Sequence, residues 1–194
     1  WGGVLEILRK HGVDWTTVHL RTVADGYHAP ARYALARDVA AASPCPMLIN
    51  GDIQTVAQGL EMIEQTKCWG VSVGRGAIRY PWIFRRKNNP ATAPATFAEA
   101  HDYLQWVVAG CRSIGPMKGY LNFLGLSVDP DGRFLKAMRQ SRTPEELLKL
   151  GEEWLLSRGQ EPFPEAPFPR LYARPSMERP RQPTATDDCT TCQG

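Results

Sequence analysis

Two short polar stretches have the composition of a phosphate-binding site. Asn-Gly-Asp occupies residues 50–52 and Gly-Arg-Gly occupies residues 74–76, and each follows a short apolar run. Consecutive strands of a (β/α)8 barrel hold phosphate through loops at their C-terminal ends, where glycine lets the backbone come close. Arg75 would add a guanidinium fork suited to phosphate. Plain tight turns are the alternative, and the spacing of one βα unit between the stretches favours the phosphate site.

The cysteines and the overall charge restrict the kind of protein. Five cysteines are odd in number and widely scattered, which argues against a secreted disulfide scaffold and favours a reducing cytoplasm. Cys189 and Cys192 lack the second pair that a zinc site needs, so we predict no metal site and an inert tail. The sequence shows neither a bilayer-spanning apolar run nor a signal-peptide pattern. The net charge of +3 says little about partners.

Helix and strand signals alternate through residues 1–84. Apolar residues at helical spacing predict a helix that ends at Gly12. The segments that follow are a strand over 15–18, a helix over 32–42, a strand over 47–49, a helix from residue 55 and a strand over 71–73. This alternation predicts an α/β fold of parallel βαβ units. Three strands are too few to close a barrel, so we expect the other strands upstream of Trp1.

A change in composition after Phe84 indicates a second unit. Residues 85–95 have the basic, proline-rich composition of a linker, and Thr96 with Glu99 marks the start of a helix. Three more helical segments are expected to join it in a small all-α bundle. From residue 160 prolines recur without apolar periodicity, which predicts a disordered tail. The expected domains are therefore 1–90, 91–159 and 160–194.

Three segments together resemble the tRNA-dihydrouridine synthases. They are Gly-Val-Asp-Trp leading into Val-His-Leu-Arg-Thr (12–22), Ile-Asn-Gly-Asp-Ile (49–53), and Gly-Arg-Gly-Ala followed by Pro-Trp-Ile-Phe (74–84). The resemblance implies the C-terminal part of an FMN-binding TIM (β/α)8 barrel, followed by a helical tRNA-binding domain. It also implies a cytoplasmic enzyme, monomeric when complete, that reduces a uridine of tRNA to 5,6-dihydrouridine with FMN and NADPH. Residues 117–124 resemble the bacterial members acting on the tRNA D-loop, where position 16 is the favoured target.

The resemblance also implies which residues bind the flavin. The matching positions are His19, Asn50, Gly51, Asp52, Gly74 and Arg75. The proton-donating cysteine of the family lies in an Asn-x-Gly-Cys-Pro segment that this chain does not contain, so we expect no catalytic residue here and no activity from this fragment alone. Cys45 precedes its strand and belongs at the wrong end of the barrel for chemistry. Leu20 and Tyr80 replace the glycine and asparagine that are usual in the family.

Basic residues of the helical part are the candidates for contacts with tRNA. Six lie between positions 112 and 142, against only Asp129 and Asp131. A tRNA is recognised chiefly through its backbone and shape, which requires several cations on one surface. We assign RNA binding to Lys118, Arg133, Lys136 and Arg139, with Asn122 beside Lys118 on an outward face. A solvated helix face is the alternative. These basic residues would form a strip on the surface, which could continue through Arg75, Arg79, Arg85, Arg86 and Lys87.

Two other functions are compatible with the sequence. Another FMN-dependent barrel oxidoreductase would share the phosphate motifs, but the basic helical extension argues against a small-molecule substrate. A non-catalytic RNA-binding remnant would keep the helical part and lose the chemistry. Flavin absorbance of the purified protein separates the two enzyme hypotheses from the remnant.

Overall fold

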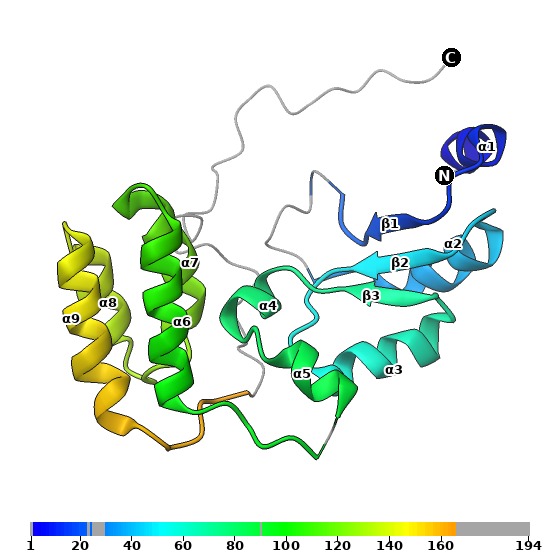
Figure 1. Ribbon diagram of the computed structural model, residues 1–194. Helices are drawn as coiled ribbons and strands as arrows, with labels where there is room; N and C mark the ends of the chain where they lie inside the picture. Colours follow the sequence, from blue (N-terminus) through cyan, green and yellow to red (C-terminus); the bar gives the residue numbers. More distant parts are fainter. Residues whose placement is uncertain (1, 23, 25–29, 90, 166–194) are drawn as a thin grey trace.

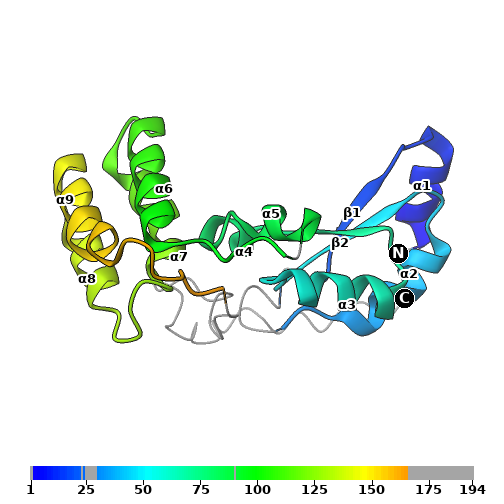
Figure 2. The ribbon, with the colours of Figure 1, turned by 60° about the horizontal axis from the view of Figure 1, so that its bottom comes forward.

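A small parallel sheet lies at one end of the molecule and a bundle of helices at the other (Figure 1). The computed structural model describes residues 2–22, 24, 30–89 and 91–165. The short helices α4 (Arg75–Arg79) and α5 (Ile83–Asn88) lie between the two parts, as Figure 2 shows from a second direction. Among the described residues, none of the helices has the length and apolar content that a membrane crossing requires.

The sheet contains three parallel strands in the order β1-β2-β3. These are β1 (Thr16–His19), β2 (Met47–Asn50) and β3 (Gly70–Ser72). Asn50 of the central strand β2 is paired with His19 of β1 on one side and with Ser72 of β3 on the other. Because the strands are parallel and in this register, His19, Asn50 and Ser72 lie in a row at one edge of the sheet. The predicted alternation of parallel strands with helices is confirmed.

Helices connect the strands and cover the sheet. Helix α1 (Gly2–His11) precedes β1, the short η1 (Tyr33–Leu35) and α2 (Ala36–Ala42) lead into β2, and α3 (Val56–Thr66) leads into β3. The start of α3 is fixed by a capping box, in which Gln58 N donates to Thr55 Oγ1 and Thr55 N donates to Gln58 Oε1. Ala36 and Val39 of α2 are buried with Met47 and Ile49 of β2. This core holds the sheet against its connecting helices.

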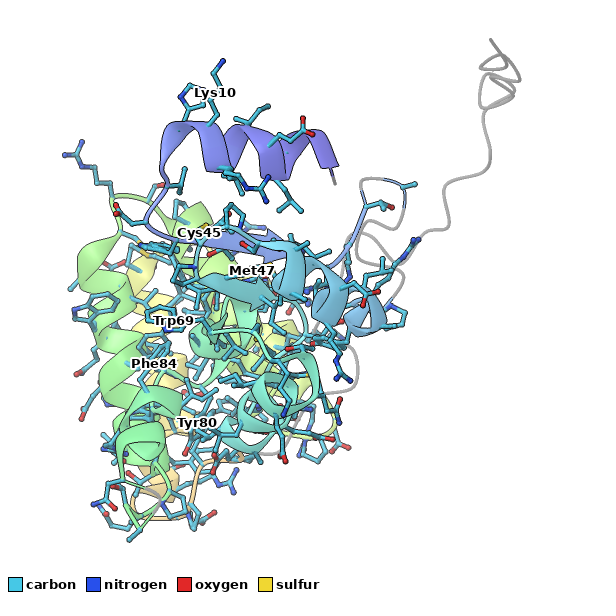
Figure 3. The ribbon with its side chains drawn as sticks, turned by 90° about the vertical axis from the view of Figure 1, so that its right-hand side faces the viewer. Lys10, Cys45, Met47, Trp69, Tyr80 and Phe84 are labelled. Atoms are coloured by element: carbon cyan, nitrogen blue, oxygen red, sulfur yellow. The ribbon has the colours of Figure 1, made fainter. Side chains whose placement is uncertain are left out.

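An apolar groove of about 330 Å³ lies between α3, β3 and α5. Leu60, Trp69 and Phe84 line it and are 57%, 70% and 53% exposed. Figure 3 shows Trp69 and Phe84 on the same side of the molecule. Helical spacing predicts Leu60 on an inward face with Val56 and Ile63, and this prediction is wrong for Leu60. Spacing identifies the apolar stripe of a helix, but not whether the chain covers all of it.

The second part is a bundle of four helices followed by a short 3-10 turn. Its helices are α6 (Phe97–Gly110), α7 (Ile114–Gly125), α8 (Arg133–Gln140) and α9 (Pro144–Trp154), and η2 (Leu156–Arg158) closes it. Thr96 and Thr143 cap α6 and α9 through their side chains. Leu104, Leu121 and Leu147 are fully buried between the helices. Helical spacing predicts Tyr120 on the inward face of α7 with Met117, Leu121 and Leu124, and this prediction is wrong, since Tyr120 is 46% exposed.

The two parts share one core at their junction. Tyr80 and Ile83 are buried in the same apolar cluster as the helices of the bundle, and the N–H of Ala95 donates to the Tyr80 hydroxyl at 3.1 Å. The predicted linker over 85–95 therefore begins inside α5 and ends in the core. The asparagine that is usual at position 80 in the family has no ring to fill this space.

Arg79 belongs to this junction and not to an exposed basic strip. It is 1% exposed, and its guanidinium donates to Ser127 Oγ at 2.8 Å and to the carbonyl of Glu165 at 3.0 Å. Burial lowers the pKa of Arg79. The predicted place of Arg79 in the tRNA strip is thus wrong, because Arg79 is the last residue of α4 and is buried between sheet and bundle.

The segment 160–165 is anchored to the bundle by Phe163, contrary to the expectation of disorder from residue 160, while residues 160–162 and 164 are exposed. Phe163 is 1% exposed, lies between the rings of Tyr80 and Phe97, and donates its N–H to Ala95 O at 2.7 Å. One aromatic residue inserted into an existing aromatic cluster leaves no periodic signal in the sequence. Residues 166–194, including Cys189 and Cys192, lie outside the described residues.

Candidate functional site

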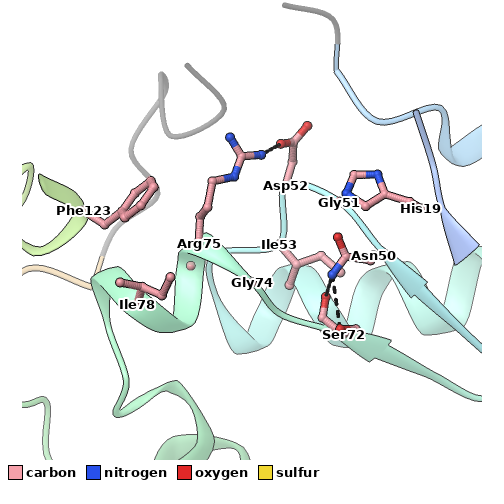
Figure 4. A pocket seen from close by; sticks show the side chains of 11 residues that line it. His19, Asn50, Gly51, Asp52, Ile53, Ser72, Gly74, Arg75, Ile78 and Phe123 are labelled. Carbon is pink, nitrogen blue, oxygen red and sulfur yellow. Dashed lines mark hydrogen bonds and ion pairs between the residues drawn. The ribbon is translucent and has the colours of Figure 1, made fainter. Parts of the chain in front are cut away.

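The C-terminal ends of the strands open into a cavity of about 260 Å³ (Figure 4). The six residues predicted to bind a cofactor all line it: His19 as the last residue of β1, Asn50 as the last residue of β2 with Gly51 and Asp52 after it, and Gly74 and Arg75 after β3. They come from three segments that are about 25 to 30 residues apart in the chain, and the parallel register brings them together. Their roles in binding stay predictions.

Asp52 is the electrostatic centre of the cavity. Its carboxylate binds the guanidinium of Arg21, accepts a hydrogen bond from Ala31 N at 3.1 Å, and pairs with Arg75 Nη2 at 3.4 Å. The side chain of Arg21 is 2% exposed, whereas those of Asp52 and Arg75 are each 21% exposed. Two guanidinium groups therefore share the carboxylate of Asp52 next to the cavity.

The turn after β2 depends on Gly51 and on the half-buried Tyr33. Gly51 has φ of +148°, and a Cβ there would lie 2.8 Å from Ala31 Cβ. The hydroxyl of Tyr33 donates to the carbonyl of Gly51. Burial, followed by the negative charge of Asp52, raises the pKa of Tyr33 to about 12, so this donor keeps its proton at neutral pH. The hydrogen bond from Tyr33 thus holds the backbone of residues 50–52 in place, while the side chains of Asn50 and Asp52 line the cavity.

Gly76 lets the two loops approach each other. A Cβ at this position would lie 2.4 Å from the carbonyl oxygen of Ile53 and 3.1 Å from Gln54 Cα. Only glycine fits between α4 and the loop after β2 at this distance. The third residue of the Gly-Arg-Gly stretch therefore sets the separation between Arg75 and Asp52.

Asn50 fastens β2 to β3 at the cavity edge. Its Nδ2 donates to Ser72 O at 3.1 Å and lies 3.2 Å from Ser72 Oγ, and Figure 4 shows the amide nitrogen directed at Ser72. Asn50 therefore orders the end of the sheet in addition to lining the cavity.

Three residues in or beside the cavity were not singled out as site residues from the sequence. Arg21 does not line the cavity but binds Asp52, and its place two residues after His19 in the same family-like segment was the available signal. Ile78 of α4 and Phe123 of α7 form an apolar wall on the opposite side of Arg75 from His19. Phe123 comes from the helical bundle, and no local pattern of the sequence connects it to the strand ends.

The candidate RNA-binding residues lie on α7 and α8, and two of them, Lys118 and Arg139, contact each other. Lys118 Nζ donates to the carbonyl of Arg139 at 2.8 Å, and Arg139 Nε donates to Asn122 Oδ1 at 2.8 Å. Arg133 Nη2 lies 3.5 Å from Asp131 Oδ2, and the guanidinium carbon of Arg133 lies 5.6 Å from the centroid of the Trp154 ring. Lys136 is exposed on α8. Lys118 and Asn122 therefore stabilise the α7–α8 contact, and they are only partly exposed.

The described cysteines lie away from the cavity. Cys45 and Cys68 precede β2 and β3, at the N-terminal ends of the strands, and Cys111 follows α6. The cavity is at the opposite ends of the strands. This agrees with the expectation that Cys45 is misplaced for chemistry.

Comparison with known proteins identifies the family. The model of the dihydrouridine synthase family matches residues 3–114, which include all three strands, the cavity loops and α6. This chain belongs to the dihydrouridine synthase family. The family resemblance seen in the sequence is confirmed.

Individual relatives cover only part of the chain and of their own length. A probable tRNA-dihydrouridine synthase of Aquifex aeolicus is 29% identical over 101 residues, which are 52% of this chain and 32% of the relative. A tRNA-dihydrouridine(16) synthase of Cupriavidus necator is 30% identical over 127 residues, 60% of this chain and 39% of the relative. A probable tRNA-dihydrouridine synthase of Rickettsia bellii is 36% identical over 78 residues, which are 40% of this chain and 24% of the relative. The chain spans about a third of the length of these relatives.

Proposed function

We propose that this chain provides the flavin-phosphate site and the tRNA-docking helices of a tRNA-dihydrouridine synthase. The observation that supports this most directly is the meeting of all six predicted flavin-binding residues in one cavity at the C-terminal ends of parallel strands. In this proposal β1, β2 and β3 are strands six to eight of a TIM barrel, whose ligands bind at that end. The bundle of α6 to α9 is the helical tRNA-binding domain.

The cavity suits the phosphate of FMN. The cluster contains the guanidinium groups of Arg21 and Arg75 and the carboxylate of Asp52, and Arg75 is the less buried of the two cations. A guanidinium forms bidentate, charge-assisted hydrogen bonds with phosphate. The backbone of Gly74 borders the same space, and a Cβ added there would meet nothing within 4 Å. The residues present therefore fit an anionic group.

The remaining walls suit the flat ring of the cofactor. Ile78 and Phe123 supply apolar surface, and His19 supplies a polar side chain at the end of β1. Bound flavin would deliver a hydride, obtained from NADPH, to C6 of the target uracil. A relative in Schizosaccharomyces pombe is named tRNA-dihydrouridine(20a/20b) synthase [NAD(P)+], which supports a nicotinamide reductant. The chain itself contributes binding and orientation, since its described cysteines lie away from the cavity.

We propose a uridine of the tRNA D-loop as the substrate. The relative named tRNA-dihydrouridine(16) synthase supports position 16, and it covers more of this chain than the other relatives named above. The basic residues of α7 and α8 would contact the tRNA backbone. The target base must leave its stack to reach the flavin, as base-modifying enzymes require.

Flavin binding tests the proposal. The purified chain is mixed with FMN and passed through a gel-filtration column, and the protein fraction should carry flavin absorbance. A chain that binds tRNA without retaining FMN would instead be the RNA-binding remnant. A chain that retains FMN and does not bind tRNA would support the oxidoreductase that acts on small molecules.

A further inference from the structure

Four aromatic side chains lead from the cavity across the surface of the bundle. Phe123 lines the cavity, and Tyr120 lies three residues earlier on α7, so both occupy neighbouring positions of one helix face. Tyr103 of α6 comes next. Its ring stacks on that of Trp106 with centroids 6.2 Å apart and an interplanar angle of 16°. We call Phe123, Tyr120, Tyr103 and Trp106 the aromatic track.

The links of the track are supported by separate observations. Helices α6 and α7, which carry Tyr103 and Tyr120, pack against each other. Burial, and in second place the nearby phenol of Tyr120, raise the pKa of Tyr103. The ring of Trp82 packs edge-on against the ring of Tyr103, with the two centroids 6.1 Å apart. The rings of Tyr103 and Trp106 are therefore already arranged, and a ligand that stacks on them need not order them.

The outer rings of the track are open to solvent. Trp106 is 71% exposed and Tyr120 is 46% exposed, although both are large enough to stabilise a core if buried. Asp102 lies one turn before Trp106 on α6, and its side chain is 77% exposed. A carboxylate at this place repels phosphate groups. The track thus favours an aromatic or apolar ligand group over the charged backbone of a nucleic acid.

We propose that the aromatic track stacks unpaired bases of the bound tRNA next to the flavin cavity. This inference rests on the proposed function, and it adds a second kind of RNA contact to it. Single-stranded bases stack on exposed aromatic rings in many RNA-binding proteins, and every base offers a face for such stacking. The phosphates then lie toward the cations of α8, while the bases face α6 and α7. The continuity with the cavity through Phe123 gives a path for a splayed-out loop next to the target uridine.

The test replaces Trp106 by alanine and compares it with a matched control. Trp69, at the edge of β3, is 70% exposed and lies on the apolar groove, so Trp69→Ala removes an equally exposed indole elsewhere. Affinities for an unmodified tRNA transcript and for a single-stranded oligouridylate are measured at low and moderate salt by fluorescence anisotropy. Trp106→Ala should weaken both about tenfold, the cost of losing one stacked base. The salt dependence should stay unchanged, because no phosphate contact is lost.

Further variants separate stacking from other effects. Trp106→Tyr keeps an aromatic face and should restore most of the affinity, and Tyr120→Ala should weaken binding as Trp106→Ala does. Equal affinities of Trp106→Ala and Trp69→Ala would overturn the inference and leave the face to a protein partner. An altered salt slope in Trp106→Ala would also overturn it, since a phosphate contact would then be involved. FMN retention by the unchanged chain tests the proposed function separately, so a chain that holds flavin but no oligouridylate refutes only the aromatic track.

Discussion

Asp52 and Arg75 connect the loops that follow β2 and β3, with Oδ1 of Asp52 3.4 Å from Nη2 of Arg75. Asp52 also binds the buried Arg21, so Arg75 receives only part of the attraction of this carboxylate. The ion pair therefore orients the guanidinium of Arg75 beside the cavity.

Arg75→Ala should weaken FMN retention. One charge-assisted contact to phosphate contributes about 1.5–3 kcal/mol, equivalent to roughly a ten- to hundredfold lower affinity. Flavin content after gel filtration, or a fluorescence titration with FMN, measures the effect. Arg85→Ala is the control, because Arg85 pairs with Glu99 away from the cavity. Undiminished FMN binding by Arg75→Ala would refute the role assigned to this residue.

Gly76→Ala should destabilise the fold. The added methyl would lie 2.4 Å from a backbone oxygen, and a shift of the two loops to admit it should cost about 1–3 kcal/mol of the free energy of unfolding. Gly119→Ala is the matched control, since nothing lies within 4 Å of a Cβ there and Gly119 is inside α7. It should stabilise the protein by about 0.5–1 kcal/mol. Urea unfolding of both variants measures these effects, and a Gly76→Ala variant as stable as the original chain would contradict the close approach.

Arg79→Met should loosen the segment 160–165. The variant loses hydrogen bonds to Ser127 and to the carbonyls of Pro164 and Glu165, which should cost about 2–4 kcal/mol. Limited proteolysis should then cut near residues 160–165 sooner than in the original chain. The control Arg85→Met removes an exposed arginine instead, and equal cleavage of the two variants would show that Arg79 does not hold this segment.

Charge reversal at Lys118, Arg133 and Arg139 should weaken tRNA binding and flatten its salt dependence. Each lost phosphate contact reduces the slope of log affinity against log salt by about 0.7 to 0.9. Lys118 and Arg139 also fasten α7 to α8, so Lys136→Glu tests the charge alone at an exposed site. Lys149→Glu on α9 is the control for net charge. FMN retention should not change in any of these variants, and unaffected tRNA affinity would mean that these cations form a solvated face.

Stability should depend on pH through Glu99. The hydrogen bond from Arg85, and secondarily that from the N–H of Thr96, lower the pKa of Glu99 below its usual 4.5. A carboxyl whose pKa is lowered by folding stabilises the protein above its unfolded-state pKa, and this contribution is lost as the pH falls through the folded-state pKa. Unfolding free energies should therefore decrease from about pH 5 downward, and less steeply in Arg85→Met. An identical pH dependence in both proteins would contradict the coupling.

The sequence by itself determined the local elements and the composition of the candidate site. Strand and helix periodicity, and capping pairs such as Thr55 with Gln58 and Thr96 with Glu99, depend on residues close together in the chain. The same holds for the two glycine-containing stretches after β2 and β3. Parallel strands must place such stretches at the edge of the sheet formed by their C-terminal ends, so their meeting in one cavity could be expected from the sequence.

Only the tertiary structure decided which side chains the parts of the chain share. Phe123 reaches the cavity from the bundle, Arg79 is buried between sheet and bundle, and Phe163 completes an aromatic cluster from a segment without periodicity. Each depends on how elements distant in sequence pack, and neither helical spacing nor composition encodes that packing. Leu60 and Tyr120 are the converse case, since helical spacing predicts both to face inward and both are exposed. An apolar position becomes buried only where another part of the protein covers it.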